Sequence, residues 1–307
     1  MIIVRRRRIF FLLLMIIVLI LVIFEWHSSQ SSGRMFQTMI FERDYVRFPV
    51  FRENLISHIT RIWKPIRSRV RMFDMTENQI VKSECVLLNT LNGTTPICIY
   101  DPRNDGMISS YVKDYGTWEQ DMLNATGSVL LRNPELSFFD LGCNIGVYTL
   151  FIAKLCRYVV AVDSVWTSLS LLHKSVKLGN FQNRIALIWN AVSDVYENVT
   201  MDIPPSNFGG AHIVRKDSSN SSDSKNLVET VTLSDFTELF RSKKVFMKMD
   251  IEGYELRALR GGRDFFEEVD VRYILMEWVH HRYNDNGNKI IHILVPYGFL
   301  PYANLDK

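Results

Sequence analysis

The fold is decided by residues 139–146, which read Phe-Asp-Leu-Gly-Cys-Asn-Ile-Gly. The apolar segment 136–140 predicts a short buried strand that ends before Gly142, and the apolar stretch 145–155 predicts a helix. Gly142 and Gly146 let the backbone bend sharply, and the helix N-terminus offers free N–H groups to an anion. These residues therefore predict a strand, a tight turn and a helix that together bind a ligand.

Strands and helices continue to alternate along the rest of the chain. Further strands are predicted at 158–163, 185–192, 245–250 and 271–278, and further helices at 166–178, 252–259 and 290–295. Strands that alternate with helices imply right-handed crossovers and a mostly parallel sheet covered on both faces. We therefore predict an α/β, Rossmann-like, doubly wound fold, which binds its ligand at the carboxyl ends of the strands.

The residues at the first two strand ends indicate an adenosine-containing cofactor. Asp163 ends the second strand, 21 residues after Gly142, where it can accept hydrogen bonds from a ribose diol. A dinucleotide fingerprint would have glycine in place of Asn144, and Asp140 would set a negative charge beside the pyrophosphate. S-adenosylmethionine has no phosphate, and its ammonium suits Asp140 while its carboxylate suits the helix N-terminus. Charge matching therefore favours S-adenosylmethionine.

A second polar group follows the strand predicted at 245–250. Asp250 and Glu252 leave this strand at the ligand-binding edge, where they can take a proton from a hydroxyl or hold the substrate. His212, in a preceding loop, is a rival base, whereas Glu255 is interpreted as an acid that the helix dipole favours. Two carboxylates without a third obvious ligand give weak support for a metal, so no metal site is predicted.

Five segments resemble motifs of the FkbM-type methyltransferases. They are 139–146, Ala161-Val162-Asp163, Asn190-Ala191-Val192-Ser193-Asp194, Lys248-Met249-Asp250-Ile251-Glu252-Gly253-Tyr254-Glu255 and Met276-Glu277. The segment 116–119 also resembles a lead-in found in animal members of the family. The resemblance implies a class I, seven-stranded methyltransferase fold that transfers a methyl group from S-adenosylmethionine, usually to oxygen.

The resemblance also implies which residues hold the cofactor. Carried over by position, they are Asp140, Gly142, Asn144, Gly146, Asp163, Ser193 and Asp194, the last two near the adenine. Asp250 would face the reacting centre. The chain ends at Lys307, where this fold normally completes its terminal antiparallel strands, so we expect a truncated or shortened edge of the sheet.

The N-terminal segment predicts a membrane anchor. Residues 9–24 are sixteen consecutive apolar residues directly after four arginines, so residues 1–8 form a cytosolic tail by the positive-inside rule. A cleavable signal peptide is the alternative, but no small-x-small cleavage site follows Phe24. We therefore predict a single-pass type II membrane protein of the endoplasmic reticulum or Golgi, with a stem and short helices at 25–76 and a lumenal methyltransferase-like domain at 77–307.

Glycosylation motifs and cysteines bear on the same prediction. Acceptor motifs for N-glycosylation begin at Asn92, Asn124, Asn198 and Asn220, which favours a lumenal domain. Cys85 and Cys98 flank a predicted hairpin and could pair in an oxidising lumen. The alternative is four buried thiols, and Cys143 and Cys156 are expected inside core elements.

Composition limits the partners. The chain is 47% hydrophobic and 22% charged, as in folded proteins, and its net charge is +3. Without the N-terminal arginines and Glu25, 32 basic residues balance 32 acidic ones, which argues against nucleic acid as the main partner. A lumenal domain suggests a small-molecule, glycan, lipid or secreted-protein acceptor, and nothing in the sequence indicates an oligomeric state.

A non-catalytic function is the alternative. The fold also resembles that of Star, a type II membrane protein of animals involved in the trafficking of secreted growth-factor ligands. Such a protein would bind client proteins in the secretory pathway. Because Asp140 and Asp163 are both present, the sequence favours the enzyme.

Overall fold

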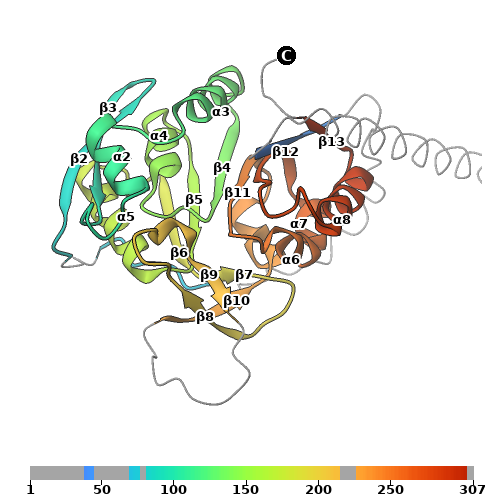
Figure 1. Ribbon diagram of the computed structural model, residues 1–307. Helices are drawn as coiled ribbons and strands as arrows, with labels where there is room; N and C mark the ends of the chain where they lie inside the picture. The colour runs from blue at the N-terminus through green and yellow to red at the C-terminus, as the bar shows by residue number, and fades with distance from the viewer. Residues whose placement is uncertain (1–37, 45–68, 77–80, 215–225, 303–307) are drawn as a thin grey trace, which may run out of the picture.

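A seven-stranded sheet forms the centre of the molecule. The computed structural model describes residues 38–44, 69–76, 81–214 and 226–302. The strands follow the order β13-β1-β12-β11-β4-β5-β6 (Figure 1). Five of them are parallel, namely β4 (Leu136–Leu141), β5 (Val159–Asp163), β6 (Ile185–Trp189), β11 (Lys244–Met249) and β12 (Asp270–Glu277). The predicted α/β fold with a mostly parallel sheet is therefore confirmed.

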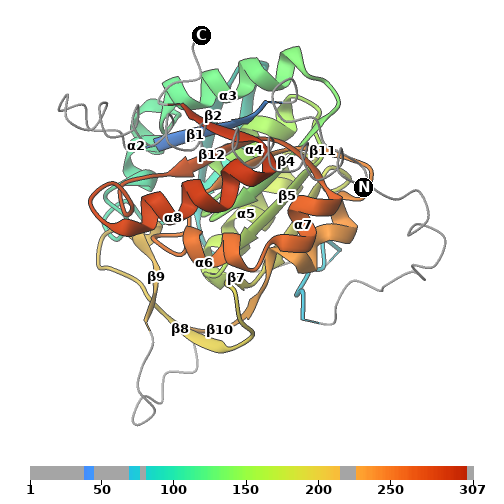
Figure 2. The same cartoon turned by 90° about the vertical axis from the view of Figure 1, so that its right-hand side faces the viewer.

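Helices cover both faces of this sheet. One face carries α2 (Ile108–Tyr115), α3 (Gln120–Arg132), α4 (Val147–Lys154) and α5 (Trp166–Leu178). The other carries η3 (Leu233–Phe240), α6 (Glu255–Arg260), α7 (Arg263–Glu268) and α8 (Asp285–Leu294), and Figure 2 looks onto the last three. All six residues of β4 are buried, with Phe138 in one core and Phe139 in the other. Burial on both faces explains why the apolar residues of this strand do not alternate with exposed polar ones.

The antiparallel edge of the sheet comes from both ends of the described chain. β1 (Thr38–Arg43) pairs with β12 on one side and with β13 (Phe299–Tyr302) on the other. Residues 25–76 were predicted to hold a stem and short helices, and this is wrong at β1. Met39, Ile40 and Phe41 are buried consecutively, and so short an apolar run does not distinguish a strand from a helix. The edge that we expected to be truncated or shortened is thus completed by β1 and β13.

A smaller sheet lies beyond the carboxyl ends of the central strands (Figure 1). It has the order β7-β10-β8-β9, from β7 (Ala191–Val192), β10 (Leu227–Val231), β8 (Asn198–Asp202) and β9 (His212–Val214), and a short turn, η1 (Phe208–Gly210), precedes β9. The strand predicted at 185–192 is therefore interrupted at Asn190. The side chain of Asn190 bonds to the Arg71 N–H and to the carbonyls of Arg69 and Glu229, which holds the break.

A disulfide-linked hairpin packs beside α4 and α5. β2 (Glu84–Thr90) and β3 (Gly93–Ile99) pair antiparallel, and Cys85 lies opposite Cys98 and forms a disulfide with it. Of the two alternatives that the sequence left open, the structure has the disulfide. Cys143 is buried as expected, but Cys156 is exposed, because it lies in the turn after α4 with φ of +61°.

Two helix boundaries differ from the prediction. The helix expected from Glu252 begins at Glu255, because Glu252 and Gly253 have φ of +53° and +89°, outside the helical region. α8 begins at Asp285, five residues earlier than expected, and the Asn284 side chain caps it by accepting the Asn286 N–H. A final single turn, η4 (Val295–Tyr297), leads into β13.

In the part of the chain that the structure describes, no helix has the length and apolar character needed to span a bilayer. The predicted anchor at 9–24 lies outside the described residues.

Candidate active site

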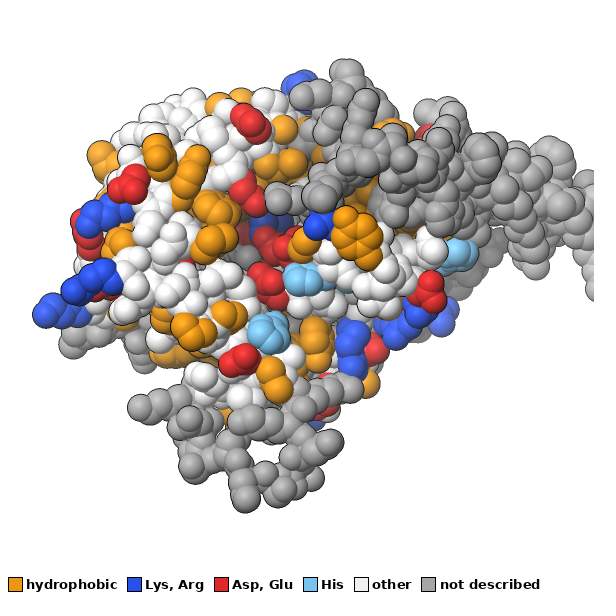
Figure 3. Space-filling model, in the orientation of Figure 1, with side chains coloured by type: hydrophobic (Ala, Val, Ile, Leu, Met, Phe, Trp, Pro, Cys, Tyr) orange, Lys and Arg blue, Asp and Glu red, His pale blue; other side chains and the backbone are white. Residues whose placement is uncertain are grey.

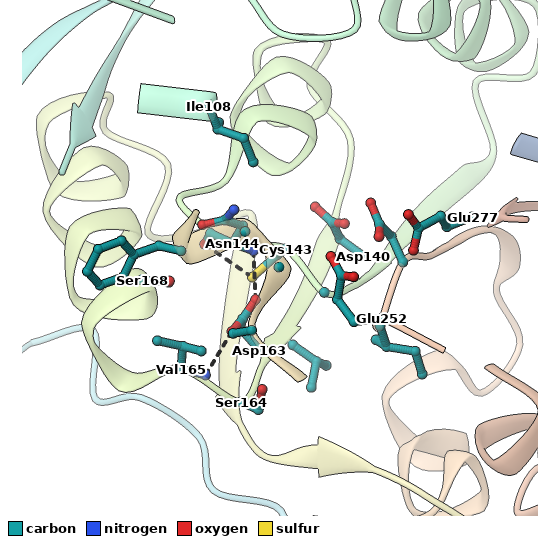
Figure 4. Close-up of a pocket in the computed structure, with 18 of the residues that line it drawn as sticks. Ile108, Asp140, Cys143, Asn144, Asp163, Ser164, Val165, Ser168, Glu252 and Glu277 are labelled. Carbon is teal, nitrogen blue, oxygen red and sulfur yellow. Dashed lines mark hydrogen bonds between the residues drawn. The ribbon is translucent and has the colours of Figure 1, made fainter. Parts of the chain in front are cut away.

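A cavity of about 390 Å³ opens where the central parallel strands end. Asp140 and the turn after β4, Asp163 at the end of β5, Asp250 and Glu252 after β11, and Glu277 at the end of β12 all line it. Figure 3 shows acidic side chains and histidines gathered around a hollow in this face, and Figure 4 shows the wall from within. The predicted strand-end residues therefore converge on one site.

The glycine turn after β4 has the predicted conformation. Gly142 has φ of +77°, and a Cβ there would lie 1.7 Å from the carbonyl oxygen of Asp250. Gly146 has φ of +90°, and a Cβ there would lie 2.2 Å from Leu172. Between them, Asn144 also has a positive φ, and its side-chain oxygen accepts the Ile145 N–H. Gly142 thus allows the turn to pack directly against the exit of β11, so both halves of the site are fixed relative to each other.

Asp163 connects the first two strand ends. Its Oδ2 accepts the Asn144 N–H at 2.7 Å and its Oδ1 accepts the Val165 N–H at 2.8 Å (Figure 4). Burial raises the pKa of Asp163 to about 6, although both backbone hydrogen bonds lower it. The Asp163 carboxylate therefore positions the glycine turn, and its remaining lone pairs are available at the cavity wall.

Asp140 is completely buried at the base of the cavity. Its Oδ2 accepts the Thr149 hydroxyl at 2.6 Å, whereas its Oδ1 has no hydrogen-bond partner among the described residues. Burial raises the pKa of Asp140, and Lys248 acts against that rise. A buried carboxylate oxygen without a partner costs about 1–3 kcal/mol. A cationic group in the cavity would remove this cost.

An ion pair stands beside Asp140 on the neighbouring strand. Lys248 Nζ lies 2.9 Å from Asp250 Oδ2 and 5.0 Å from the ring centre of Tyr148. Burial alone would lower the pKa of Lys248, but the carboxylates of Asp250 and Asp140 outweigh it and raise that pKa. Lys248 is therefore a fixed positive charge between the two carboxylates.

Several carboxylates lie close together at the end of the cavity that is formed by the exits of β11 and β12. His280 Nε2 lies 3.2 Å from Glu252 Oε2 and 3.6 Å from Glu277 Oε2. Burial and the charges of Asp250 and Glu252 raise the pKa of Glu277 to about 10, and burial followed by Asp250 raises the pKa of Glu252. On the adjoining wall, the Tyr148 hydroxyl donates to Glu119 at 2.9 Å.

A buried pair beneath this end joins its two loops. Glu255 and His281 are both inaccessible to solvent, with Glu255 Oε2 at 2.7 Å from His281 Nε2. Glu255 Oε1 accepts the Ile251 N–H at 3.0 Å. The interpretation of Glu255 as an acid in the first helical turn is confirmed, but its carboxylate also ties the exit of β11 to the loop after β12.

Three predicted site residues lie outside the cavity wall. His212 is the first residue of β9, and its neighbours Ala211 and Ile213 line the cavity, so alternation along the chain turns His212 to the other face. There it lies 3.8 Å from Asp202. The structure therefore does not bring His212 together with Asp250 and Glu252 at the cavity wall.

Ser193 and Asp194 follow β7, and neither of them lines the cavity. Ser193 is buried, and its N–H donates to the Val231 carbonyl. Asp194 accepts a hydrogen bond from Arg257 Nε at 2.8 Å and is not among the residues that line the cavity. Asn190, Ala191 and Val192, which immediately precede them, line the cavity.

Several polar residues of the wall were not predicted as site residues, among them Glu119, Tyr148, Lys248, Glu277 and His280. Lys248 and Glu277 were quoted as parts of motifs, without a role. The rule that picks out Asp250, a polar residue at a strand end, would also have found Glu277. Glu119 lies just before α3, within the segment 116–119 that resembles a lead-in of the family, and Tyr148 lies on α4, where no sequence signal marks it.

One comparison with known proteins gives a match. A family model described as the methyltransferase FkbM domain matches residues 140–300, more than half of the chain. No curated protein and no solved structure matches the chain. The matched region begins at Asp140 and includes the exits of β4, β5, β11 and β12, which form the cavity.

Proposed function

The chain belongs to the FkbM methyltransferase family, and from this premise we propose that it moves a methyl group from S-adenosylmethionine to a hydroxyl oxygen. The acceptor would be a glycan, a lipid or a secreted protein. The single observation that carries the proposal is Asp140, whose buried Oδ1 has no partner among the described residues and lies at the base of the cavity.

The residues of the cavity fit this cofactor. Asp140 Oδ1 would accept a hydrogen bond from the ammonium, and Asp163 would accept from the ribose hydroxyls. The apolar side chains of Val192 and Phe208 line the wall on the adenine side. When bound, S-adenosylmethionine supplies an electrophilic methyl group on a positively charged sulfur. Gly142, Asn144 and Gly146 would shape the turn against which it lies.

Asp250 is the residue we propose as the base. Its carboxylate lines the cavity, is 34% exposed and is held at Oδ2 by Lys248. Lys248 fixes the direction of the carboxylate, so Asp250 can accept the proton of an acceptor hydroxyl as that oxygen attacks. Glu252 would help to orient the acceptor. Much of the remaining rate enhancement would come from alignment of the two reactants.

We also propose that the domain works in the lumen of the endoplasmic reticulum or Golgi, behind a type II anchor at 9–24. The Cys85–Cys98 disulfide supports an oxidising compartment. Asn92 and Asn198, which begin two of the glycosylation motifs, are exposed. Asn124 is partly buried on α3, where it accepts a hydrogen bond from Gln120, and is therefore a poorer acceptor site.

The test is calorimetry of the purified full chain with S-adenosylmethionine. We expect one site, and we expect Asp140→Asn to weaken binding at least tenfold, about 1.4 kcal/mol, because the amide cannot replace the charge. His212→Gln is the matched control and should bind as the wild type does. If millimolar cofactor gives no binding to the wild type, the client-binding alternative replaces the enzymatic one.

A further inference from the structure

A set of three possible metal ligands lies at the end of the cavity that is formed by the exits of β11 and β12. Glu252, Glu277 and His280 each offer one ligand atom, and these atoms all lie within 4.8 Å of one another. We propose that the three residues bind a divalent metal ion. The sequence suggested only Asp250 and Glu252, on one strand exit, whereas folding adds Glu277 and His280 from the exit of β12.

Two carboxylate oxygens in this cavity have neither accessible surface nor a hydrogen-bond partner within the described part of the chain. They are Oδ1 of the fully buried Asp140 and Oε2 of Glu277. Figure 4 shows Asp140, Glu252 and Glu277 on the same side of the cavity. The ammonium of the proposed cofactor can serve Asp140. Oε2 of Glu277, which belongs to the three-ligand set, would still need a cation.

The charges of the cavity wall also call for a cation. Six acidic side chains line it: Glu119, Asp140, Asp163, Asp250, Glu252 and Glu277. The basic side chains are Lys248, whose ammonium is already paired with Asp250, and His280. S-adenosylmethionine carries a net charge of about +1, with its ammonium and sulfonium offset by its carboxylate. A divalent ion held by the three-ligand set would pair with the carboxylates of Glu252 and Glu277.

The chemistry of the ligand set points to Mn²⁺ or a similar ion. Two carboxylates suit hard cations such as Mg²⁺ and Mn²⁺, and one imidazole suits Zn²⁺, Fe²⁺ and other transition metals. Mn²⁺ accepts both kinds of ligand. Three protein ligands leave coordination positions open toward the cavity for water or an acceptor oxygen.

A role for the ion in methyl transfer rests on the proposed function. Acting as a Lewis acid, the ion would lower the pKa of an acceptor hydroxyl, and Asp250 would take the proton. The hydroxyl oxygen then forms a bond to the methyl carbon while the carbon–sulfur bond breaks, and the electron pair of that bond stays on sulfur. Binding of the ion itself does not depend on this role and can be measured without an acceptor.

The test is a titration of the metal-stripped full chain with Mn²⁺, followed by the electron paramagnetic resonance signal of the free ion. We expect one site, weakened at least tenfold by His280→Gln and by Glu277→Gln, each of which removes one ligand. His212→Gln is the matched control, since His212 also lies near a carboxylate, Asp202, but belongs to no such three-ligand set among the described residues. It should leave Mn²⁺ binding unchanged.

S-adenosylmethionine binding in the presence of a chelator separates this inference from the proposed function. It should persist in the wild type and in His280→Gln, which also shows that the variant is folded. Mn²⁺ binding that is absent at millimolar concentration, or that survives in His280→Gln combined with Glu252→Gln, overturns the metal site. If cofactor binds while Mn²⁺ does not, only the metal inference fails.

Discussion

Acidification should weaken cofactor binding in a way that the site geometry sets. Burial raises the pKa of Asp163 to about 6. A ribose diol donates hydrogen bonds, so the ionised carboxylate is the form that binds it. Near pH 7.5 Asp163 is almost fully ionised, whereas at pH 5 only about one molecule in eleven carries the charge. The apparent dissociation constant rises as this fraction falls, by about tenfold between the two values.

Protonation of Asp140 adds to the pH dependence of cofactor binding and does not reverse its direction. Burial raises its pKa too, and an ammonium ligand also requires its ionised form, so tenfold is a lower bound. The assay is calorimetry with S-adenosylmethionine at several values between pH 5 and 7.5. In Asp163→Asn, binding should be weaker at pH 7.5 and should depend less on pH. A wild-type dissociation constant that stays constant over this range would refute the reasoning.

The same shift has an opposite consequence for the unliganded protein. A carboxyl with a higher pKa in the folded state binds its proton more tightly there than in the unfolded chain. Asp163 therefore lowers the free energy of unfolding as the pH rises from about 4 to about 6, by about 3 kcal/mol at most. Urea titrations at several pH values without cofactor should show that the free energy of unfolding falls more steeply with rising pH in the wild type than in Asp163→Asn.

Three further predictions concern the turn, Asp194 and the hairpin. Gly142→Ala should lower the free energy of unfolding by about 3 kcal/mol, measured by urea titration, because a Cβ would collide with the Asp250 carbonyl at a positive φ; wild-type stability would contradict the close packing of the turn. Asp194→Asn should leave S-adenosylmethionine affinity within about twofold of wild type, since Arg257 holds that carboxylate outside the wall; a loss as large as that of Asp140→Asn would return it to the site. Replacing both Cys85 and Cys98 by alanine should cost about 3 kcal/mol, because the disulfide closes a loop with a sequence separation of 13; unchanged unfolding under reducing and oxidising conditions would show that the bond does not form.

The parallel core of the fold could be predicted because its strands are buried on both faces. A segment such as 136–141, in which apolar residues do not alternate with exposed polar ones, leaves few alternatives to a buried parallel strand once a glycine turn and an apolar helix follow it. β1 could not be predicted in the same way. Its six residues acquire their strand identity from β12 and β13, more than 200 residues away in the chain. Sequence periodicity contains no information about such a partner.

The site divides along the same line. Asp140, Asp163 and Asp250 were predicted because each follows from one local rule, the position of a polar residue at a strand end. Asp194 satisfies a similar rule, but Arg257, distant in sequence, competes for its carboxylate. His212 depends on which face of a three-residue strand turns inward, and that is decided by how β9 packs. Local rules find the strand ends, whereas tertiary contacts decide which side chains face the cavity.

The central claim is that Asp140 recognises the ammonium of the methyl donor. The most direct measurement is a crystal structure of the protein with S-adenosylhomocysteine, which has the same ammonium and ribose. The account predicts the ammonium nitrogen within about 3 Å of Asp140 Oδ1, with the ribose hydroxyls against Asp163. A ligand bound with its ammonium on other groups, and Asp140 Oδ1 still unpaired, would contradict it.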